Sequence, residues 1–172
     1  ELRLLAGRVA PEQPDLVLRL ADLLCKRLND ARGALVVYND ALRSTPGDEQ
    51  LVAALEGLAA TYPALAVDAG RLLEPVYETE KQSAKLLGVL RARLETVAEA
   101  DERRSLRLRI ADLAGAALGD AAGAYAALEA AFLDNPSDTS LWDLLGDAAE
   151  RAGQAEALAQ ALTTAVEAGD LG

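Results

Sequence analysis

Apolar residues recur along almost the whole chain at the three- and four-residue spacing of an amphipathic helix, and no segment alternates as a half-buried strand does. In residues 14–28, for example, leucines at 16, 20, 23, 24 and 28 lie on one broad helical face. The pattern predicts nine helices joined by short connections, preceded by a helical fragment over residues 1–10. The expected helices cover residues 14–28, 31–43, 49–61, 64–78, 81–99, 101–118, 121–134, 139–152 and 154–168.

Polar capping residues and turn-forming residues support several of these helix boundaries. Asn29 and Asp30 are expected to end one helix and cap the next, and Asp48 is a favourable N-cap after the turn cluster 44–48. Pro75 falls inside the fourth expected helix. A proline there removes a backbone donor, so we expect it to kink that helix or to split off its last turn.

The chain also repeats itself. Residues 16–62 recur 90 positions later as residues 106–152, with about 17 of 47 positions identical and no gap, which marks a repeat architecture. Five expected helices fill each 90-residue period. Simple two-helix hairpins cannot produce an odd number, so either the fourth helix splits at Pro75 or one helix is extra.

Composition agrees with an all-α protein, because the apolar half of the chain is mostly Ala, Leu and Val with few aromatic residues. The 28 acidic and 17 basic residues give a net charge of −11, which argues against a nucleic acid or an anionic membrane as partner. No run of about 18 apolar residues and no signal-peptide core appears, so membrane insertion is not expected. The sequence indicates no cellular compartment beyond that of a soluble protein, and the cytoplasm is the default expectation.

The two copies resemble tetratricopeptide repeats (TPRs), helical hairpins of about 34 residues. The family places a small residue, an aromatic residue, a small residue and a proline along and after its second helix. This chain has Ala34, Tyr38, Ala41 and Pro46 at that spacing, then Ala124, Leu128, Ala131 and Pro136, and Trp142, Leu145 and Gly146 match the opening of the family's first helix. The resemblance implies an all-α, right-handed α-α superhelix (solenoid) of TPR-like hairpins.

The resemblance is uneven along the chain. It is good over residues 14–62 and 101–168 and poor over residues 63–100, and Asp22 and Asp112 stand where the family wants Gly. A divergent or half-a-TPR type therefore fits best. Residues 1–172 are interpreted as a single TPR-like segment, cut from a longer repeat protein.

In the family, the first helix of each hairpin lines a concave groove. Carried over by position, the partner-binding residues would be Arg19, Leu23, Lys26, Arg27, Arg109, Leu113, Asp143 and Asp147. Alternatively, Arg19 and Arg109 only pair with Asp22 and Asp112 three residues on, an arrangement worth about 0.2–0.5 kcal/mol. Trp142 is interpreted as a packing residue rather than a partner anchor, and the arginines of residues 103–109 as a solvated face.

Nothing in the chain indicates catalysis. There is no His, no Cys cluster and no phosphate-binding loop, and Cys25 is interpreted as a buried hydrophobe. No cofactor or metal is expected. The sequence predicts a protein–protein interaction scaffold that binds a peptide or helix of a partner. The alternatives are a spacer or self-association module, including a homodimer through truncated repeat ends, and more remotely a helical enzyme.

Overall fold

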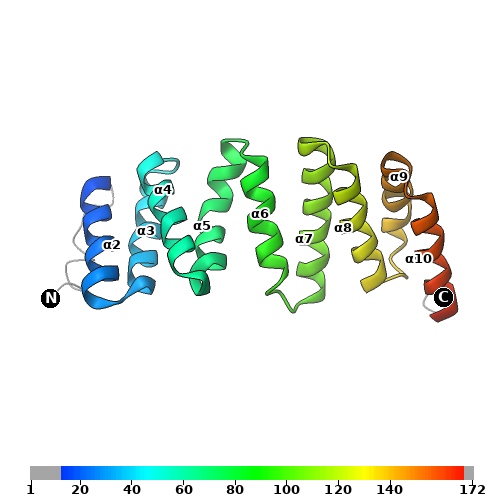
Figure 1. The fold of residues 1–172 in the computed structure, drawn as a ribbon, viewed down its shortest axis with the longest axis horizontal. Coiled ribbons are helices and arrows are strands. Elements are labelled where there is room, and N and C mark those ends of the chain that lie inside the picture. Colours follow the sequence, from blue (N-terminus) through cyan, green and yellow to red (C-terminus); the bar gives the residue numbers. More distant parts are fainter. Residues whose placement is uncertain (1–12, 169–172) are drawn as a thin grey trace. The chain divides into compact units, whose positions relative to one another are not determined.

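The computed structural model describes residues 13–168, and this part of the chain contains helices and no strand (Figure 1). Nine α-helices occur in it, and consecutive helices within each unit defined below run in opposite directions. They are α2 (Pro14–Leu28), α3 (Ala31–Ser44), α4 (Glu49–Thr61), α5 (Ala66–Thr79), α6 (Ser83–Leu94), α7 (Ala100–Asp112), α8 (Ala121–Asp134), α9 (Trp142–Ala152) and α10 (Ala155–Ala168). The all-α prediction is confirmed for these residues, whereas the fragment predicted over residues 1–10 lies outside them.

Most boundaries fall close to those expected, but α6 is shorter. It ends at Leu94 rather than near residue 99, where the backbone and hydroxyl of Thr96 both donate to the carbonyl of Arg93 at 2.9 Å. Thr96 and Val97 are β-branched and restrict side-chain freedom in a helix. A tight turn therefore replaces the last expected helical turn.

Of the two alternatives expected at Pro75, a kink or a split of the helix, the split is wrong. Helix α5 continues through Pro75 to Thr79. The residues around the proline explain this, since Leu73, Val76 and Tyr77 are each no more than 5% exposed. Their burial offsets the hydrogen bond that proline cannot make. The complete 90-residue period, from α2 to α6, therefore keeps its odd helix.

The predicted caps are confirmed and recur in the two copies. Asn29 and Gly119, at equivalent positions, both adopt left-handed backbone angles that end a helix. Asp30 and Asp120 follow them, and each carboxylate accepts a hydrogen bond from the backbone N–H three residues on, at 2.9 and 2.8 Å. Asp48 caps α4 in the same way through Gln50 and Leu51.

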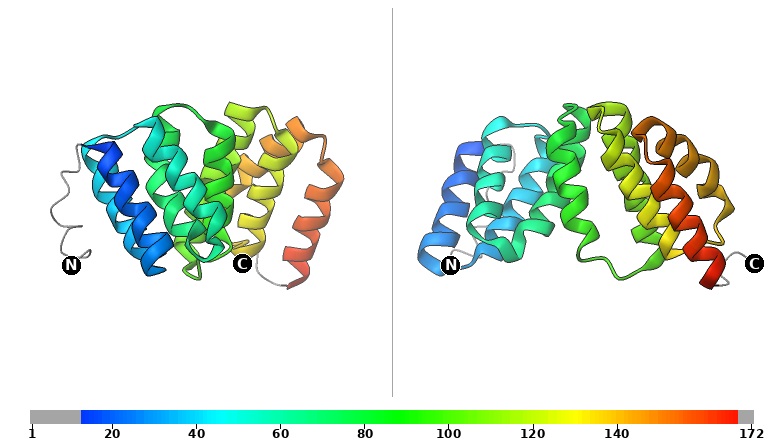
Figure 2. Two further views of the ribbon diagram at one scale, coloured as in Figure 1. Left: turned by 60° about the vertical axis from the view of Figure 1, so that its left-hand side comes forward. Right: turned by 45° about the vertical axis from the view of Figure 1, so that its right-hand side comes forward.

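The chain divides into two compact units, Glu1–Gln82 and Ser83–Gly172. In the first unit, α2 contacts both α3 and α4, and α4 packs against α5 (Figure 2). Ala34 and Ala41, expected at the helix crossings, are fully buried. Tyr77 joins α5 to α4, because its hydroxyl donates to Glu56 Oε1 at 2.7 Å.

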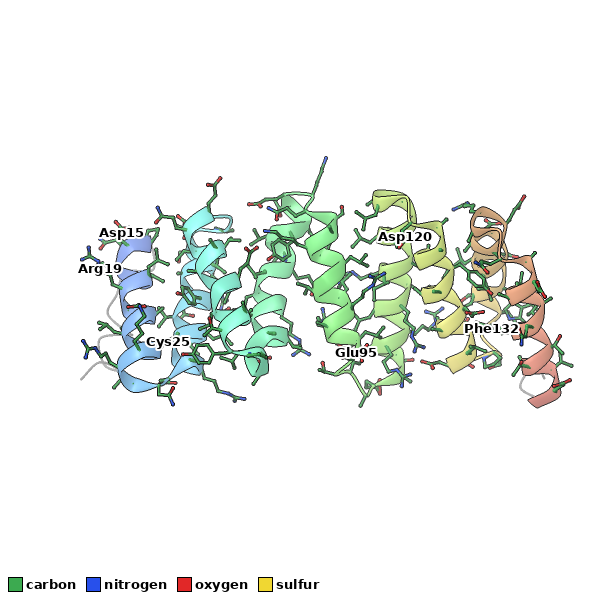
Figure 3. All side chains as sticks on the ribbon, in the orientation of Figure 1. Asp15, Arg19, Cys25, Glu95, Asp120 and Phe132 are labelled. Atoms are coloured by element: carbon green, nitrogen blue, oxygen red, sulfur yellow. The ribbon has the colours of Figure 1, made fainter. Side chains whose placement is uncertain are left out.

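In the second unit, α6 packs against α7, which packs against α8, and α8 contacts both α9 and α10. The core contains Phe132, Leu141 and Leu145, each at most 1% exposed, and Figure 3 labels Phe132 on α8. The expected crossing residues Ala124 and Ala131 are buried here as well. No helix within residues 13–168 has the length and apolar character needed to span a membrane.

The arginines of α7 do not form a simple solvated face as expected. Arg103 and Arg107 both pair with Asp134 at the end of α8, and Arg107 also donates to the carbonyl of Ala130. Arg104 pairs with Asp138 at 2.5 Å in the turn before α9. The acidic partners lie 27 to 34 residues further along the chain, so local spacing could not reveal this network.

Candidate functional site

A groove with a volume of about 620 Å³ lies among α2, α3 and α4 in the first unit. We call it the first groove. Its side chains combine charged, aromatic and small groups, and Figure 3 labels two of them, Arg19 and Cys25, on α2. The lining residues are Leu18, Arg19, Ala21, Asp22, Cys25, Lys26, Tyr38, Ala54, Gly57, Leu58, Thr61 and Tyr62.

A second groove, of about 410 Å³, lies among α7, α8 and α9 in the second unit. One wall includes part of a π-helical segment, Leu113–Ala117, that extends α7. The lining residues are Leu108, Ala111, Asp112, Gly115, Ala116, Ala121, Ala124, Leu128, Leu144, Asp147, Ala148 and Arg151.

The two grooves occupy the same place in the 90-residue register. Ten of the lining positions correspond after a shift of 90, namely 18/108, 21/111, 22/112, 25/115, 26/116, 38/128, 54/144, 57/147, 58/148 and 61/151. The internal repeat therefore reproduces a surface feature as well as a helix order. Two sequence copies can form the same core without forming the same groove on their surfaces. The correspondence of the two lining sets therefore makes these grooves the strongest candidates for a binding site.

The grooves share part of one wall and differ in the other. Leu, Ala and Asp recur at 18, 21 and 22 and again at 108, 111 and 112, and both aspartates are exposed. The walls formed by α4 and α9 differ at every equivalent lining position. Gly57, Leu58 and Thr61 of the first groove, for example, correspond to Asp147, Ala148 and Arg151 of the second. We conclude that the two grooves present different chemistry on a common frame.

The surroundings of Cys25, Tyr38 and Lys26 in the first groove shift the pKa of each side chain. Burial raises the pKa of the Cys25 thiol, and burial raises the pKa of Tyr38 to about 12. Lys26 pairs with Asp22 at 2.7 Å, and this hydrogen bond raises the pKa of the ammonium. Near neutral pH the groove therefore offers a thiol, a phenol and an ion pair beside the Arg19 side chain, and these groups suit binding better than nucleophilic attack.

The structure brings together some of the site residues predicted from sequence. Arg19 and Lys26 line the first groove, and Asp147 lines the second. Leu23 and Arg27 lie exposed on α2 but outside the first groove's lining set. Arg109, Leu113 and Asp143 belong to the second unit and are absent from the second groove's lining set.

Sequence reasoning missed the second helix and much of the third as groove walls. Tyr38, Gly57 and Leu144 were not predicted, because the family pattern draws attention to the first helix of each hairpin. The identity of Leu18 and Leu108 in the 90-residue register, with Asp22 and Asp112 in place of the family's Gly, marks only the wall formed by α2 and α7. The sequence contained no comparable signal for Tyr38, Gly57 or Leu144, which differ from their equivalents in the other copy.

Two other sequence interpretations need correction. Asp22 pairs with Lys26 four residues on rather than with Arg19. Trp142 is 44% exposed, with its indole N–H donating to the carbonyl of Pro136 at 3.3 Å, so it is not primarily a core residue.

Residues 13–168 contain no group of three or more Cys, Asp or Glu side chains placed to hold a metal ion. Comparison of the chain with protein-family models, with curated proteins and with solved structures found no match in any of the three. Over residues 13–168, the fold and the site define an all-α protein with two grooves at equivalent positions of its internal repeat.

Proposed function

We propose that the chain is a protein–protein interaction scaffold, a TPR-like right-handed α-solenoid segment that binds a peptide or helix of a partner in its grooves. The observation that carries the proposal is the recurrence of one groove at equivalent positions of two sequence copies. Repeat proteins use stacked units of this kind to build extended recognition surfaces.

The chemistry of the grooves favours binding. Their walls are helices whose backbone groups are already bonded, so the side chains alone meet a ligand. A groove that exists before binding lowers the ordering cost on the scaffold's side, which leaves more of the contact energy as affinity. The raised pKa of Cys25 gives no support to a catalytic thiol.

The test is affinity capture from the native extract with substitutions that fill or polarise each groove. Gly57→Trp places a large side chain in the first groove, and nothing lies within 4 Å of a Cβ at that position. Leu144→Asp places a charge in the second groove, where Leu144 is 49% exposed. We expect at least one partner to be lost from one or both variants.

Matched controls exist in the same chain. Gly88 is also an exposed helical glycine at which a Cβ would meet nothing within 4 Å, and Leu133 is 50% exposed. Neither lines a groove described above. Gly88→Trp and Leu133→Asp should retain the partner. Equal retention by groove and control variants would refute groove binding.

A spacer or self-association module is the second candidate, and one observation favours it. Leu16 and Leu23 on α2 are 43% and 40% exposed, and their seven-residue spacing, two helical turns, places them on the same face. Exposed apolar faces of this kind promote self-association. Sedimentation velocity over a range of concentrations separates the candidates. The spacer would be favoured if the chain forms a dimer that dissociates in the double variant Leu16→Asp plus Leu23→Asp. It would also require that no captured partner depends on the grooves.

A further inference from the structure

The second groove is lined mainly by small and aliphatic residues. All but three of its lining residues are Gly, Ala or Leu, the exceptions being Asp112, Asp147 and Arg151. Leu144 on one wall remains 49% exposed although it borders the groove. The groove therefore offers an apolar floor and walls that still face solvent, and a ligand would gain free energy by covering them.

The part of the sequence that supplies every lining residue except Leu108 is strongly acidic. From Ile110 to Gly172 the sequence has eleven acidic residues and one basic residue, Arg151. Arg151 lies 3.9 Å from Asp147, but both side chains are about 70% or more exposed, so the pair is weak. The nearby arginines 103, 104 and 107 are engaged with Asp134 and Asp138. Asp112 and Asp147 in the lining, with the excess of acidic over basic residues in this part of the sequence, favour a cationic partner.

The shape of the lining favours a helix over an extended strand. A strand gains affinity by pairing its backbone with a free sheet edge, and the described residues contain no strand. A helix satisfies its own backbone and presents only side chains. Gly115 and Ala116 are small and exposed in the lining, which allows a helix to approach closely.

The π-helical segment Leu113–Ala117 distinguishes this groove from its counterpart. At the equivalent positions α2 remains a regular α-helix through Leu28. The segment contributes Gly115 and Ala116 to the lining, where the first groove has Cys25 and Lys26. Single π turns inside helices occur frequently at functional sites.

We propose that the second groove is the docking site for a cationic amphipathic helix of a partner protein. The partner's Ala and Leu side chains cover the apolar lining, and its Lys or Arg side chains contact Asp112 and Asp147. This inference rests on the proposed scaffold function and specifies the partner's chemistry.

The test uses a synthetic 18-residue peptide of about 27 Å in helical form, with Leu and Ala on one face and Lys on the other. Its binding to the full chain is measured by fluorescence anisotropy. Two comparison peptides replace every Lys by Glu, or every Leu and Ala by Ser. We expect the first peptide to bind about tenfold or more tightly than either comparison, with affinity falling as salt is raised.

Groove substitutions locate the binding. Leu144→Asp should weaken the cationic peptide by about tenfold, since it polarises the apolar wall, whereas Leu133→Asp, equally exposed, should change affinity by less than about twofold. Asp147→Asn should cost about two- to fivefold and Asp143→Asn, one turn earlier on α9, less than about twofold.

Two outcomes overturn the inference. Equal binding of the peptide that carries Ser in place of Leu and Ala would show general charge attraction, and equal weakening by the groove and control substitutions would place the peptide elsewhere. If this inference fails, the scaffold function can still be tested by affinity capture with the groove and control variants. A partner captured from extract and lost with Leu144→Asp, but lacking a cationic helix, would keep the function and reject this occupant.

Discussion

Leu16 and Leu106 show how one sequence position acquires two different structural roles. They are identical and 90 residues apart, yet Leu16 is 43% exposed and Leu106 only 2%. In the second unit α6 packs against α7, while no described helix precedes α2. Burial, rather than residue type, therefore sets what each leucine contributes to stability.

This pair yields a prediction with an internal control. Leu106→Ala should lower the free energy of unfolding by about 2–5 kcal/mol, because it removes a buried side chain and leaves a cavity. Leu16→Ala should cost less than about 1 kcal/mol, since water already reaches that side chain. Urea unfolding followed by circular dichroism measures both. Equal losses would contradict the assignment of different burial.

Asp138 predicts a pH dependence. Hydrogen bonds from Ser140 and then from Arg104 hold the pKa of its carboxyl below the ordinary value of 3.8. A lowered native pKa contributes stability above the ordinary value, and that stability is lost as pH falls through the native value. Asp138→Asn retains a good N-cap but removes the charge. In chemical unfolding, the variant should therefore lose less stability than the parent as pH falls below the ordinary carboxyl pKa.

An acid profile of Asp138→Asn that parallels the parent would contradict this role. Arg104→Ala provides a second check, because it removes one of the two partners and should reduce the acid dependence only in part.

At the residue scale, the sequence predicted what local chemistry decides. Asp30 and Asp48 cap helices within three residues of themselves, and their turn context identified them. Trp142 and Arg107 were interpreted incorrectly because their environments depend on α8 and on the turn before α9. Spacing along one helix contains no information about a partner 27 residues away.

At the element scale, helical periodicity predicted the existence and order of the helices, whereas the exceptions have physical causes outside the pattern. Pro75 remains helical because the apolar residues around it are buried. The π-helical segment Leu113–Ala117 has the same apolar spacing as a regular helix and could not be distinguished from it. Tertiary packing thus decides details that periodicity leaves open.

Two helical glycines provide a prediction at this scale. A Cβ at Gly57 meets nothing within 4 Å, whereas one at Gly33 would lie 2.7 Å from the Asp30 carboxylate that caps α3. Gly57→Ala should therefore stabilise the protein by about 0.5–1 kcal/mol through helix propensity. Gly33→Ala should yield no such gain, because the capping carboxylate must move.

The measurement is the unfolding free energy of the two variants beside the parent chain. Equal stabilisation by both would show that the Asp30 cap tolerates a methyl group at residue 33. Destabilisation by Gly57→Ala would contradict the open space described at that position.

On the scale of the whole molecule, the 90-residue repeat organises both core and surface. Sequence alone indicated the repetition and part of the grooves, through Arg19, Lys26 and Asp147. It could not identify Tyr38 or Leu144, since a groove wall arises from the packing of three helices rather than from one. The two copies nonetheless diverge mainly on one wall, which is how a repeated frame acquires different recognition surfaces.

The division into two compact units gives the last prediction. Phe132 in the second unit and Leu55 in the first are both fully buried. Phe132→Ala should cost about 3–5 kcal/mol. In a protein built from repeats, a local loss is felt mainly by the nearest neighbours. Hydrogen exchange should therefore accelerate in α6–α10 for Phe132→Ala and in α2–α5 for Leu55→Ala. Acceleration of the whole chain by either substitution would instead show one cooperative folding unit.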